Sequence, residues 1–173
     1  KVAILSRGYK LNDALADEPQ YLRDNLAVPV LIGRDRIKNA KLAKQKYQVQ
    51  AIILDDGFQH WRLYRDVDIV CIDAANPFGN GRGLPRGILR EPLSSLSRAD
   101  IIFLTKTDLG QDNLAVIKEK LSKINPQALI IESVYDALYL KRPDEEAPKI
   151  NPDELRNKRV ALLAGIASPA YFE

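Results

Sequence analysis

Short apolar runs alternate with longer amphipathic stretches along the chain. The runs consist mainly of valine, isoleucine, leucine and alanine, without the polar alternation of a half-exposed strand. This composition is typical of strands in a parallel sheet that is covered on both faces. Buried strands are therefore predicted at Val2 to Leu5, Val28 to Ile32, Ala51 to Leu54, Val67 to Ile72, Ile101 to Thr105, Ala128 to Ile131 and Val160 to Ala164.

Two of the intervening stretches have the periodicity of amphipathic helices. Arg34 to Tyr47 and Gln111 to Ile124 both place apolar residues at intervals of three and four, close to the 3.6-residue period of an α-helix. Strands that alternate with helices in this way are typical of βαβ units. The pattern predicts an α/β fold with a doubly wound, mostly parallel sheet.

The length of 173 residues predicts one domain, from residue 1 to residue 173. Two segments interrupt its regular pattern. Residues 76–92 contain four glycines and three prolines, which indicates a long loop, and long loops inside compact domains are usually functional. Residues 134–152 are rich in charge and proline and are predicted to form a solvated excursion between strands.

The composition excludes several classes of protein. Hydrophobic residues make up 46% and charged residues 28%, as in ordinary globular proteins. A net charge of +3 is too small to indicate a nucleic-acid-binding protein, and no apolar run approaches the roughly 18 residues of a membrane-spanning helix. The single cysteine, Cys71, excludes an intrachain disulfide and a cysteine-based zinc site, and it favours a reducing compartment.

Positive charge is concentrated in one part of the chain. The segment from position 82 to 98 contains one acidic residue, Glu91, and four arginines, which are Arg82, Arg86, Arg90 and Arg98. A local site for an anion is therefore predicted in this segment.

The strongest local motif places two carboxylates at the end of a predicted strand. Ala51 to Leu54 is followed directly by Asp55, Asp56 and Gly57. Ligands of open α/β sheets bind at the carboxyl ends of strands, and a carboxylate there resembles a Walker B element that holds Mg²⁺ beside nucleotide phosphates. The alternative is an Asp-Asp-Gly turn with a structural role.

His60 is the only histidine and follows this motif closely. A histidine here can act as a base, donate a hydrogen bond to a phosphate, or be an ordinary turn residue. A lone histidine more often has the structural role, its proximity to Asp55 and Asp56 slightly strengthens the first two, and the sequence leaves all three open.

The glycine-rich segment from Gly79 to Gly83 does not match a P-loop, because no Lys-Ser/Thr pair follows it. Arg86, Arg90 and Glu91 lie just downstream, beside prolines that stiffen the chain. Arginine binds phosphate through two parallel hydrogen bonds, which favours a phosphorylated ligand. A solvated charged loop is the alternative.

The tetrapeptide Thr105-Lys106-Thr107-Asp108 follows another predicted strand. It is similar to the [NT]-K-x-D motif with which GTPases recognise guanine. The same pattern also arises where a polar strand end precedes a helix cap.

Several motifs together resemble those of one enzyme family, tetraacyldisaccharide 4′-kinase, which is the lipid A 4′-kinase. The resemblance covers residues 2 to about 105 and resumes at Ala164 to Phe172. The motifs occur in the order of that family and are Ser6 to Tyr9, Asp17 to Pro19, Leu54 to His60, Arg65-Asp66, Phe78 to Gly81 and Leu84 to Pro92.

The resemblance implies a P-loop NTPase-like kinase that uses ATP and Mg²⁺. Its implied acceptor is the 4′-hydroxyl of a tetraacylated glucosamine disaccharide 1-phosphate. Such phosphoryl transfer depends on positioning and charge neutralisation more than on covalent chemistry. By this resemblance the catalytic residues are Asp17, Asp55 and Asp56, the substrate-binding residues are Arg7, Arg90, Glu91 and His60, and the metal ligands are Asp55, Glu18 and Glu91.

The family's P-loop and its histidine-rich region correspond to positions outside this sequence. We therefore expect the chain to be the central portion of a longer kinase and to be inactive by itself. The complete protein is expected at the cytoplasmic face of the bacterial inner membrane, in peripheral contact with it, with ATP and the acylated lipid as partners and no nucleic acid. The alternatives are a P-loop GTPase or metallochaperone, and a non-catalytic module that binds an anionic glycolipid.

Overall fold

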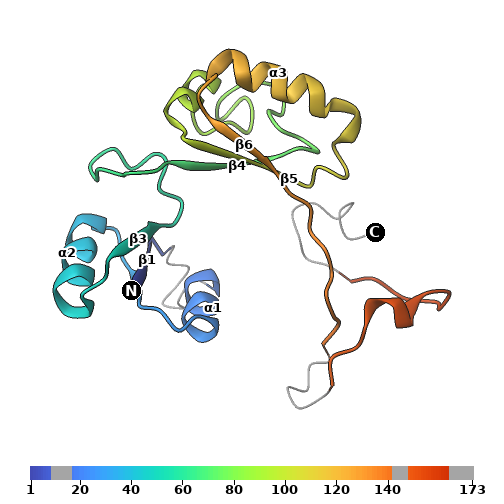
Figure 1. Ribbon diagram of the computed structural model, residues 1–173, viewed down its shortest axis with the longest axis horizontal. Helices are drawn as coiled ribbons and strands as arrows, with labels where there is room; N and C mark the ends of the chain where they lie inside the picture. Colours follow the sequence, from blue (N-terminus) through green and yellow to red (C-terminus); the bar gives the residue numbers. More distant parts are fainter. Residues whose placement is uncertain (9–16, 142–147, 164–173) are drawn as a thin grey trace. The chain divides into compact units, whose positions relative to one another are not determined.

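The computed structural model describes residues 1–8, 17–141 and 148–163. The chain divides into two compact units, residues 1–68 and residues 69–173, and each is described by itself. Both units contain a three-stranded parallel sheet with helices (Figure 1). The predicted α/β class with parallel strands is confirmed, and the prediction of one domain stays a prediction.

The first unit is built around its central strand. Its sheet has the order β2-β1-β3, with all strands parallel. Ala3 and Leu5 of the central strand are fully buried and pack with Leu31 and Ala43. The elements of this unit are β1 (Val2–Ser6), α1 (Asp17–Asn25), β2 (Val30–Ile32), α2 (Arg36–Tyr47) and β3 (Ala51–Leu54).

The start of α2 is fixed by a cap. The Asp35 side chain accepts a hydrogen bond from the Lys38 backbone N–H at 2.9 Å, which satisfies a donor that a helix start leaves unpaired. The helix predicted from Arg34 therefore begins two residues later. The helix ends at Tyr47, because the next residue, Gln48, has a left-handed φ of 51° that stops it.

The second unit has the sheet order β4-β5-β6, again parallel. Ile102 and Leu104 of the central strand are fully buried, as is Leu121 of the helix α3. The elements are β4 (Ile69–Asp73), the 3-10 helix η1 (Leu93–Arg98), β5 (Ile101–Thr105), the 3-10 helix η2 (Gln111–Asn113), α3 (Leu114–Ile124), β6 (Leu129–Glu132) and the 3-10 helix η3 (Pro152–Leu155).

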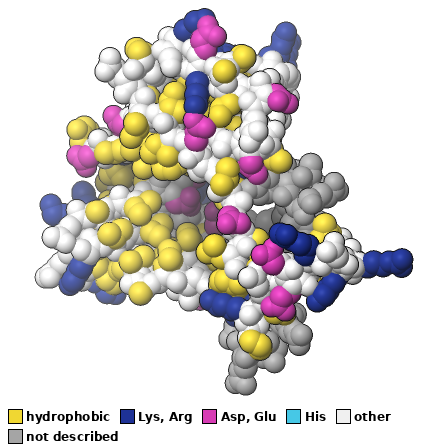
Figure 2. Space-filling model, turned by 45° about the vertical axis from the view of Figure 1, so that its right-hand side comes forward, with side chains coloured by type: hydrophobic (Ala, Val, Ile, Leu, Met, Phe, Trp, Pro, Cys, Tyr) yellow, Lys and Arg dark blue, Asp and Glu magenta, His cyan; other side chains and the backbone are white. Residues whose placement is uncertain are grey.

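Two expectations about the strands are wrong. Val160 to Leu163 form no strand among the residues that the structure describes, and Ala164 lies outside them. An apolar run becomes a strand only where a neighbour satisfies its backbone groups. The expected burial also fails at β3 and β4, where Ile53 is 56% and Ile69 53% exposed. Apolar side chains are visibly exposed on one face of the molecule (Figure 2).

The two irregular segments are described in part. Residues 76–92 form turns and bends without a regular strand or helix. The excursion is solvated, with Val134 and Leu138 exposed, and a bridge joins Leu140 to Ile150, while residues 142–147 lie outside the described part. No helix in the described ranges is long and apolar enough to cross a membrane.

The packing of α3 yields a stability prediction. Leu121→Ala should lower the free energy of unfolding by about 2–5 kcal/mol, because it leaves a cavity at a fully buried position. Val116 lies on the same helix and is 64% exposed, so Val116→Ala should change the free energy of unfolding by less than about 0.5 kcal/mol. Urea unfolding of both variants measures this, and equal losses would contradict the packing.

Candidate functional site

The carboxyl ends of β1 and β3 meet in the first unit. Leu5 pairs with Leu54, and the Asp55 N–H donates to the Leu5 carbonyl at 3.0 Å, which extends the ladder by one residue. The Ser6 Oγ then donates to the Asp55 Oδ2 at 2.8 Å. Asp55 is therefore oriented by a partly buried hydrogen bond from the neighbouring strand.

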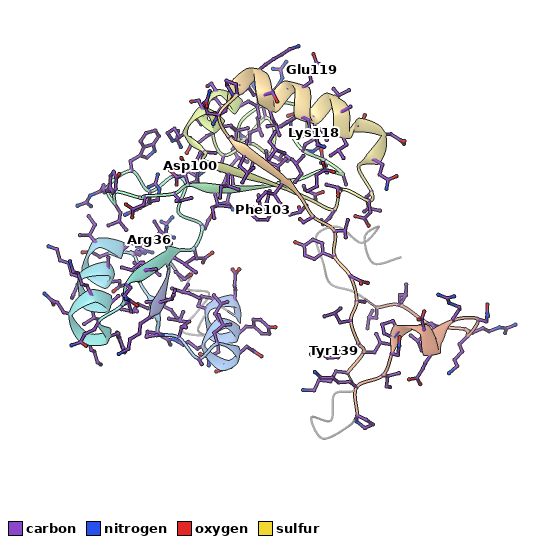
Figure 3. The ribbon with its side chains drawn as sticks, viewed as in Figure 1. Arg36, Asp100, Phe103, Lys118, Glu119 and Tyr139 are labelled. Atoms are coloured by element: carbon purple, nitrogen blue, oxygen red, sulfur yellow. The ribbon has the colours of Figure 1, made fainter. Side chains whose placement is uncertain are left out.

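The turn after Asp55 has a fixed shape. Asp56 has a left-handed φ of 47°, and its carbonyl accepts from Arg36 Nη1 at 3.1 Å. Arg36 is the first residue of α2 and is 5% exposed (Figure 3). A side chain at Gly57 would approach Leu54 to 2.7 Å, so this position requires glycine. The turn is thus rigid, and it presents Asp55 at the end of the sheet.

Asp55 is the carboxylate of this unit that could hold a magnesium ion. Mg²⁺ usually takes one or two carboxylates and completes its octahedral shell with water and phosphate oxygens. Asp55, oriented by Ser6, supplies such a carboxylate, and Asp56 follows it directly. No group of three or more His, Cys, Asp or Glu side chains that could hold a metal occurs among the residues described.

The other predicted residues of this unit are placed less fully. Arg7 follows β1 directly and is exposed, and Glu18 is exposed in the first turn of α1. Asp17 begins α1, but its side chain lies outside the described residues. Their assigned roles stay predictions.

His60 lies in the turn that follows Gly57. The backbone N–H of His60 donates to the Gly57 carbonyl at 2.8 Å. Its ring nitrogen Nε2 is buried and has no hydrogen-bond partner among the described residues. Burial lowers the pKa of His60 below its usual 6.5, and the nearby positive charges of Arg36, Arg62 and Arg65 lower it further, against a smaller opposing effect of Asp35. The imidazole is therefore largely neutral at pH 7.

Arg65 holds the segment that contains His60. Its guanidinium donates to the His60 carbonyl at 2.6 Å and pairs with Asp68 at 2.5 Å. The sequence motif Arg65-Asp66 drew attention to this arginine, but its contacts were not predicted.

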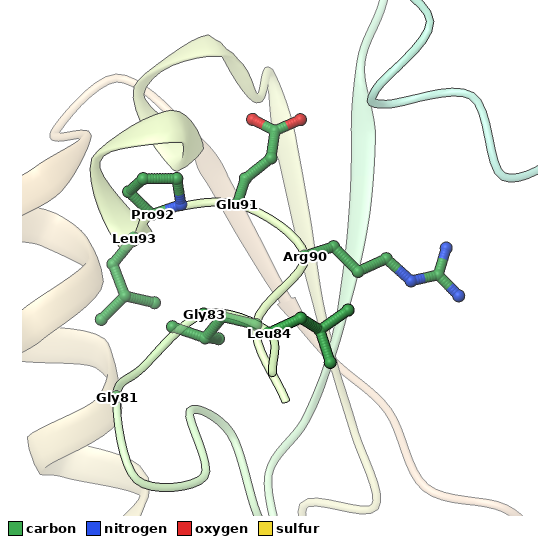
Figure 4. Close-up of a pocket in the computed structure, with 8 residues that line it drawn as sticks. Gly81, Gly83, Leu84, Arg90, Glu91, Pro92 and Leu93 are labelled. Carbon is green, nitrogen blue, oxygen red and sulfur yellow. The ribbon is translucent and has the colours of Figure 1, made fainter. Parts of the chain in front are cut away.

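The second unit carries the arginine-rich loop. A groove of about 350 Å³ is lined by Gly81, Gly83, Leu84, Leu89 and the four residues from Arg90 to Leu93 (Figure 4). The loop closes on itself, because the Leu84 N–H donates to the Leu89 carbonyl at 3.0 Å. The pocket therefore lies where the sequence predicted an anion site.

Arg90 and Glu91 differ in their surroundings within this groove. Arg90 is exposed, whereas Glu91 accepts hydrogen bonds from Arg98 Nη2 at 2.9 and 3.2 Å. The two side chains leave the backbone in different directions in Figure 4. Arg98 was noted in the sequence for its charge, and nothing there indicated its pairing with Glu91.

The Thr105 to Asp108 tetrapeptide follows β5. Lys106 has a left-handed φ of 55°, and its Nζ pairs with Asp73 Oδ2 at 2.6 Å. Thr107 is buried, and its hydroxyl donates to the Ser133 carbonyl at 3.3 Å. These contacts tie together the ends of β4, β5 and β6, which gives Lys106 and Thr107 a structural role.

The comparison with known proteins decides the family. The model of the family described as tetraacyldisaccharide-1-P 4′-kinase matches residues 1–173. The chain belongs to this family. Proteins named tetraacyldisaccharide 4′-kinase are similar to it, including those of Halothermothrix orenii, 35% identical over 99% of this chain, and Anaeromyxobacter dehalogenans, 38% identical over 99%. The resemblance found in the sequence motifs is thereby confirmed.

The match to these kinases covers only part of each relative. The chain spans 52% of the Halothermothrix protein and 50% of the Anaeromyxobacter protein, about half of their length. A relative from Elusimicrobium minutum is 40% identical over 78% of this chain and 42% of its own. No solved structure matches the chain.

The lowered pKa of His60 predicts a pH effect on stability. The unfolded chain binds a proton near pH 6.5 and the folded chain only at lower pH, so stability should be lost as pH falls below about 6.5 and through the folded pKa. In His60→Gln this loss should be reduced. Urea unfolding between neutral and acidic pH measures the difference, and identical pH profiles for the two proteins would contradict it.

Proposed function

We propose that the complete protein transfers the γ-phosphate of ATP to the 4′-hydroxyl of a tetraacylated glucosamine disaccharide 1-phosphate, in lipid A biosynthesis. The match of the family model over residues 1–173 carries this proposal. The printed names of the relatives support it, as does the Asp55 carboxylate at the end of the sheet. Both observations agree with a phosphotransferase that uses ATP and Mg²⁺.

The position of Asp55 directly after β3 supports its proposed role as a metal-binding carboxylate. When bound, Mg²⁺ would neutralise charge on the nucleotide phosphates. The Ser6 hydroxyl fixes one carboxylate oxygen of Asp55, and the Arg36 contact to the Asp56 carbonyl fixes the following turn. The chain thus orients its carboxylate before any ligand binds, which lowers the reorganisation needed during the reaction.

Arg90 in the second unit and His60 in the first unit are each proposed to contact anionic oxygen atoms. The planar guanidinium of Arg90 can donate two parallel hydrogen bonds to a phosphate. His60 is neutral at pH 7, so its imidazole can donate or accept at Nε2 according to its tautomer. We assign both residues to ligand binding, with Glu91 beside Arg90.

The acceptor determines the proposed location. Because the acylated disaccharide is a membrane lipid, the complete protein would act at the cytoplasmic face of the bacterial inner membrane, in peripheral contact with it. Its proposed partners are ATP and this lipid, without nucleic acid. A GTPase is less well supported, because Lys106 of the guanine-type motif is engaged by Asp73.

A pair of aspartate variants tests the metal site against the GTPase alternative. Asp55→Asn in the complete protein should lower kcat by about a thousandfold, roughly 4 kcal/mol, because the Mg²⁺ site loses a charge. Asp108→Asn should change kcat/KM by less than about tenfold, roughly 1.4 kcal/mol, and leave the preference for ATP unchanged.

The measurement is phosphate transfer to the disaccharide acceptor with Mg²⁺, using ATP and GTP in parallel. Near-normal kcat in Asp55→Asn would leave this aspartate a turn residue. A change of nucleotide preference from guanine toward xanthine in Asp108→Asn would favour the GTPase.

A substitution that keeps the charge tests Arg90. Arg90→Lys should raise the KM for one anionic substrate by about tenfold or more, because lysine lacks the planar fork of arginine. Steady-state kinetics with each substrate varied in turn identifies which one. Unchanged kinetics would assign Arg90 to the solvated surface.

A further inference from the structure

Glu91 is held by an arginine from outside the groove. Arg98 Nη2 lies 2.9 Å from Glu91 Oε2 and 3.2 Å from Glu91 Oε1, so one nitrogen spans both carboxylate oxygens. The side chains of Arg98 and Glu91 are 23% and 17% exposed. This partly buried pair is better shielded from water than a surface ion pair, and its geometry is correspondingly more defined.

The backbone of Arg98 is itself fixed. Arg98 ends η1, which packs against α3. Asn125, at the end of α3, is 8% exposed, and its Nδ2 donates to the Leu96 carbonyl at 3.0 Å and the Ala99 carbonyl at 2.8 Å. The carbonyls of Leu96 and Ala99, which flank Arg98 in the chain, are thus hydrogen-bonded to the end of α3. These bonds fix the backbone segment that carries the Arg98 side chain.

The fixed carboxylate restricts its neighbour. Glu91 lies between Arg90 and Pro92, and a residue before proline is confined to extended backbone conformations. With its backbone confined by Pro92 and its side chain held by Arg98, Glu91 has little freedom to rotate. Arg90 lies between Glu91 and Leu89, whose carbonyl accepts from the Leu84 N–H at 3.0 Å, so the backbone on both sides of Arg90 is held.

We propose that Arg98 is a positioning residue of the groove. It holds Glu91 and thereby directs Arg90 toward an anionic ligand, without touching that ligand itself. This inference rests on the proposed function in one respect, the phosphorylated character of the ligand. The role assigned to Arg98 goes beyond the residues identified from sequence.

Kinetics of the complete enzyme test this role. Arg98→Met should raise the KM of the same substrate that Arg90→Lys affects, by about tenfold, and leave the other KM within about twofold. Combining Arg98→Met with Glu91→Gln should cost little more than the more severe single change, because both remove one interaction. Arg98→Lys should recover part of the loss.

Arg156→Met is the matched control. Arg156 pairs with Asp153 at 2.9 Å, but both side chains are more than 70% exposed and lie outside the groove. This variant should behave as wild type. Equal kinetics for Arg98→Met and Arg156→Met would overturn the proposal, as would a loss that affects both KM values and follows the fraction of folded protein.

A second measurement does not depend on catalysis. In the complete protein, the backbone amide resonances of Leu89 to Glu91 should shift in Arg98→Met and not in Arg156→Met. If the wild-type complete protein transfers no phosphate, the proposed function fails, while these shifts still decide whether Arg98 orients the loop. Unshifted resonances would overturn the positioning role whatever the activity.

Discussion

The parallel pairing of β1 with β3 is the constraint on which the first unit depends. β1 contributes two fully buried residues to that unit, Ala3 and Leu5, and so cannot slip along its neighbour without exposing them. The register that this burial fixes pairs Leu5 with Leu54. As a result Ser6 and Asp55 leave the sheet together and their side chains meet. Apolar packing therefore sets the orientation of the proposed metal-binding carboxylate.

In the second unit, parallel strand pairing also brings polar side chains together at the carboxyl ends of strands, but there they bind one another. Asp73 and Thr105 pair at the carboxyl ends of β4 and β5, and the next residue, Lys106, reaches back to the Asp73 carboxylate. Here the polar groups at the strand ends satisfy one another. The groove with Arg90 lies instead in the long loop between β4 and β5. A position at a strand end thus identifies candidate sites, and the partners of each side chain distinguish a ligand-binding group from a structural one.

The sequence predicted the parts of the structure that depend on local pattern. Six of the predicted apolar runs contain strands, because isoleucine, valine and leucine in short runs favour a buried sheet. Val160 to Leu163 have the same composition and form no strand, because pairing depends on a neighbour that composition does not specify. Helix α1 was not predicted, since its sequence lacks a regular apolar face.

Contacts between side chains were the least predictable part of the candidate site. Asp55 was identified from its position after an apolar run, but its partner Ser6 lies 49 residues earlier and could be found only through the strand register. Arg98 and Glu91 are seven residues apart, and side chains at this spacing are not neighbours in a regular helix or strand. Their pairing needs the η1 helix and the Asn125 side chain that anchors it.

Ion pairs in these loops act through geometry more than through stability. An exposed pair usually contributes about 0–1 kcal/mol, because water screens the charges and ordering two side chains costs entropy. Arg65 with Asp68 and Arg98 with Glu91 are partly buried and join residues within loops that contain the candidate ligands His60 and Arg90. Phosphoryl transfer depends on positioned charge, so a small gain in stability can coexist with a large effect on activity. Arginines that act by positioning other side chains can therefore matter as much to the reaction as arginines that bind a ligand.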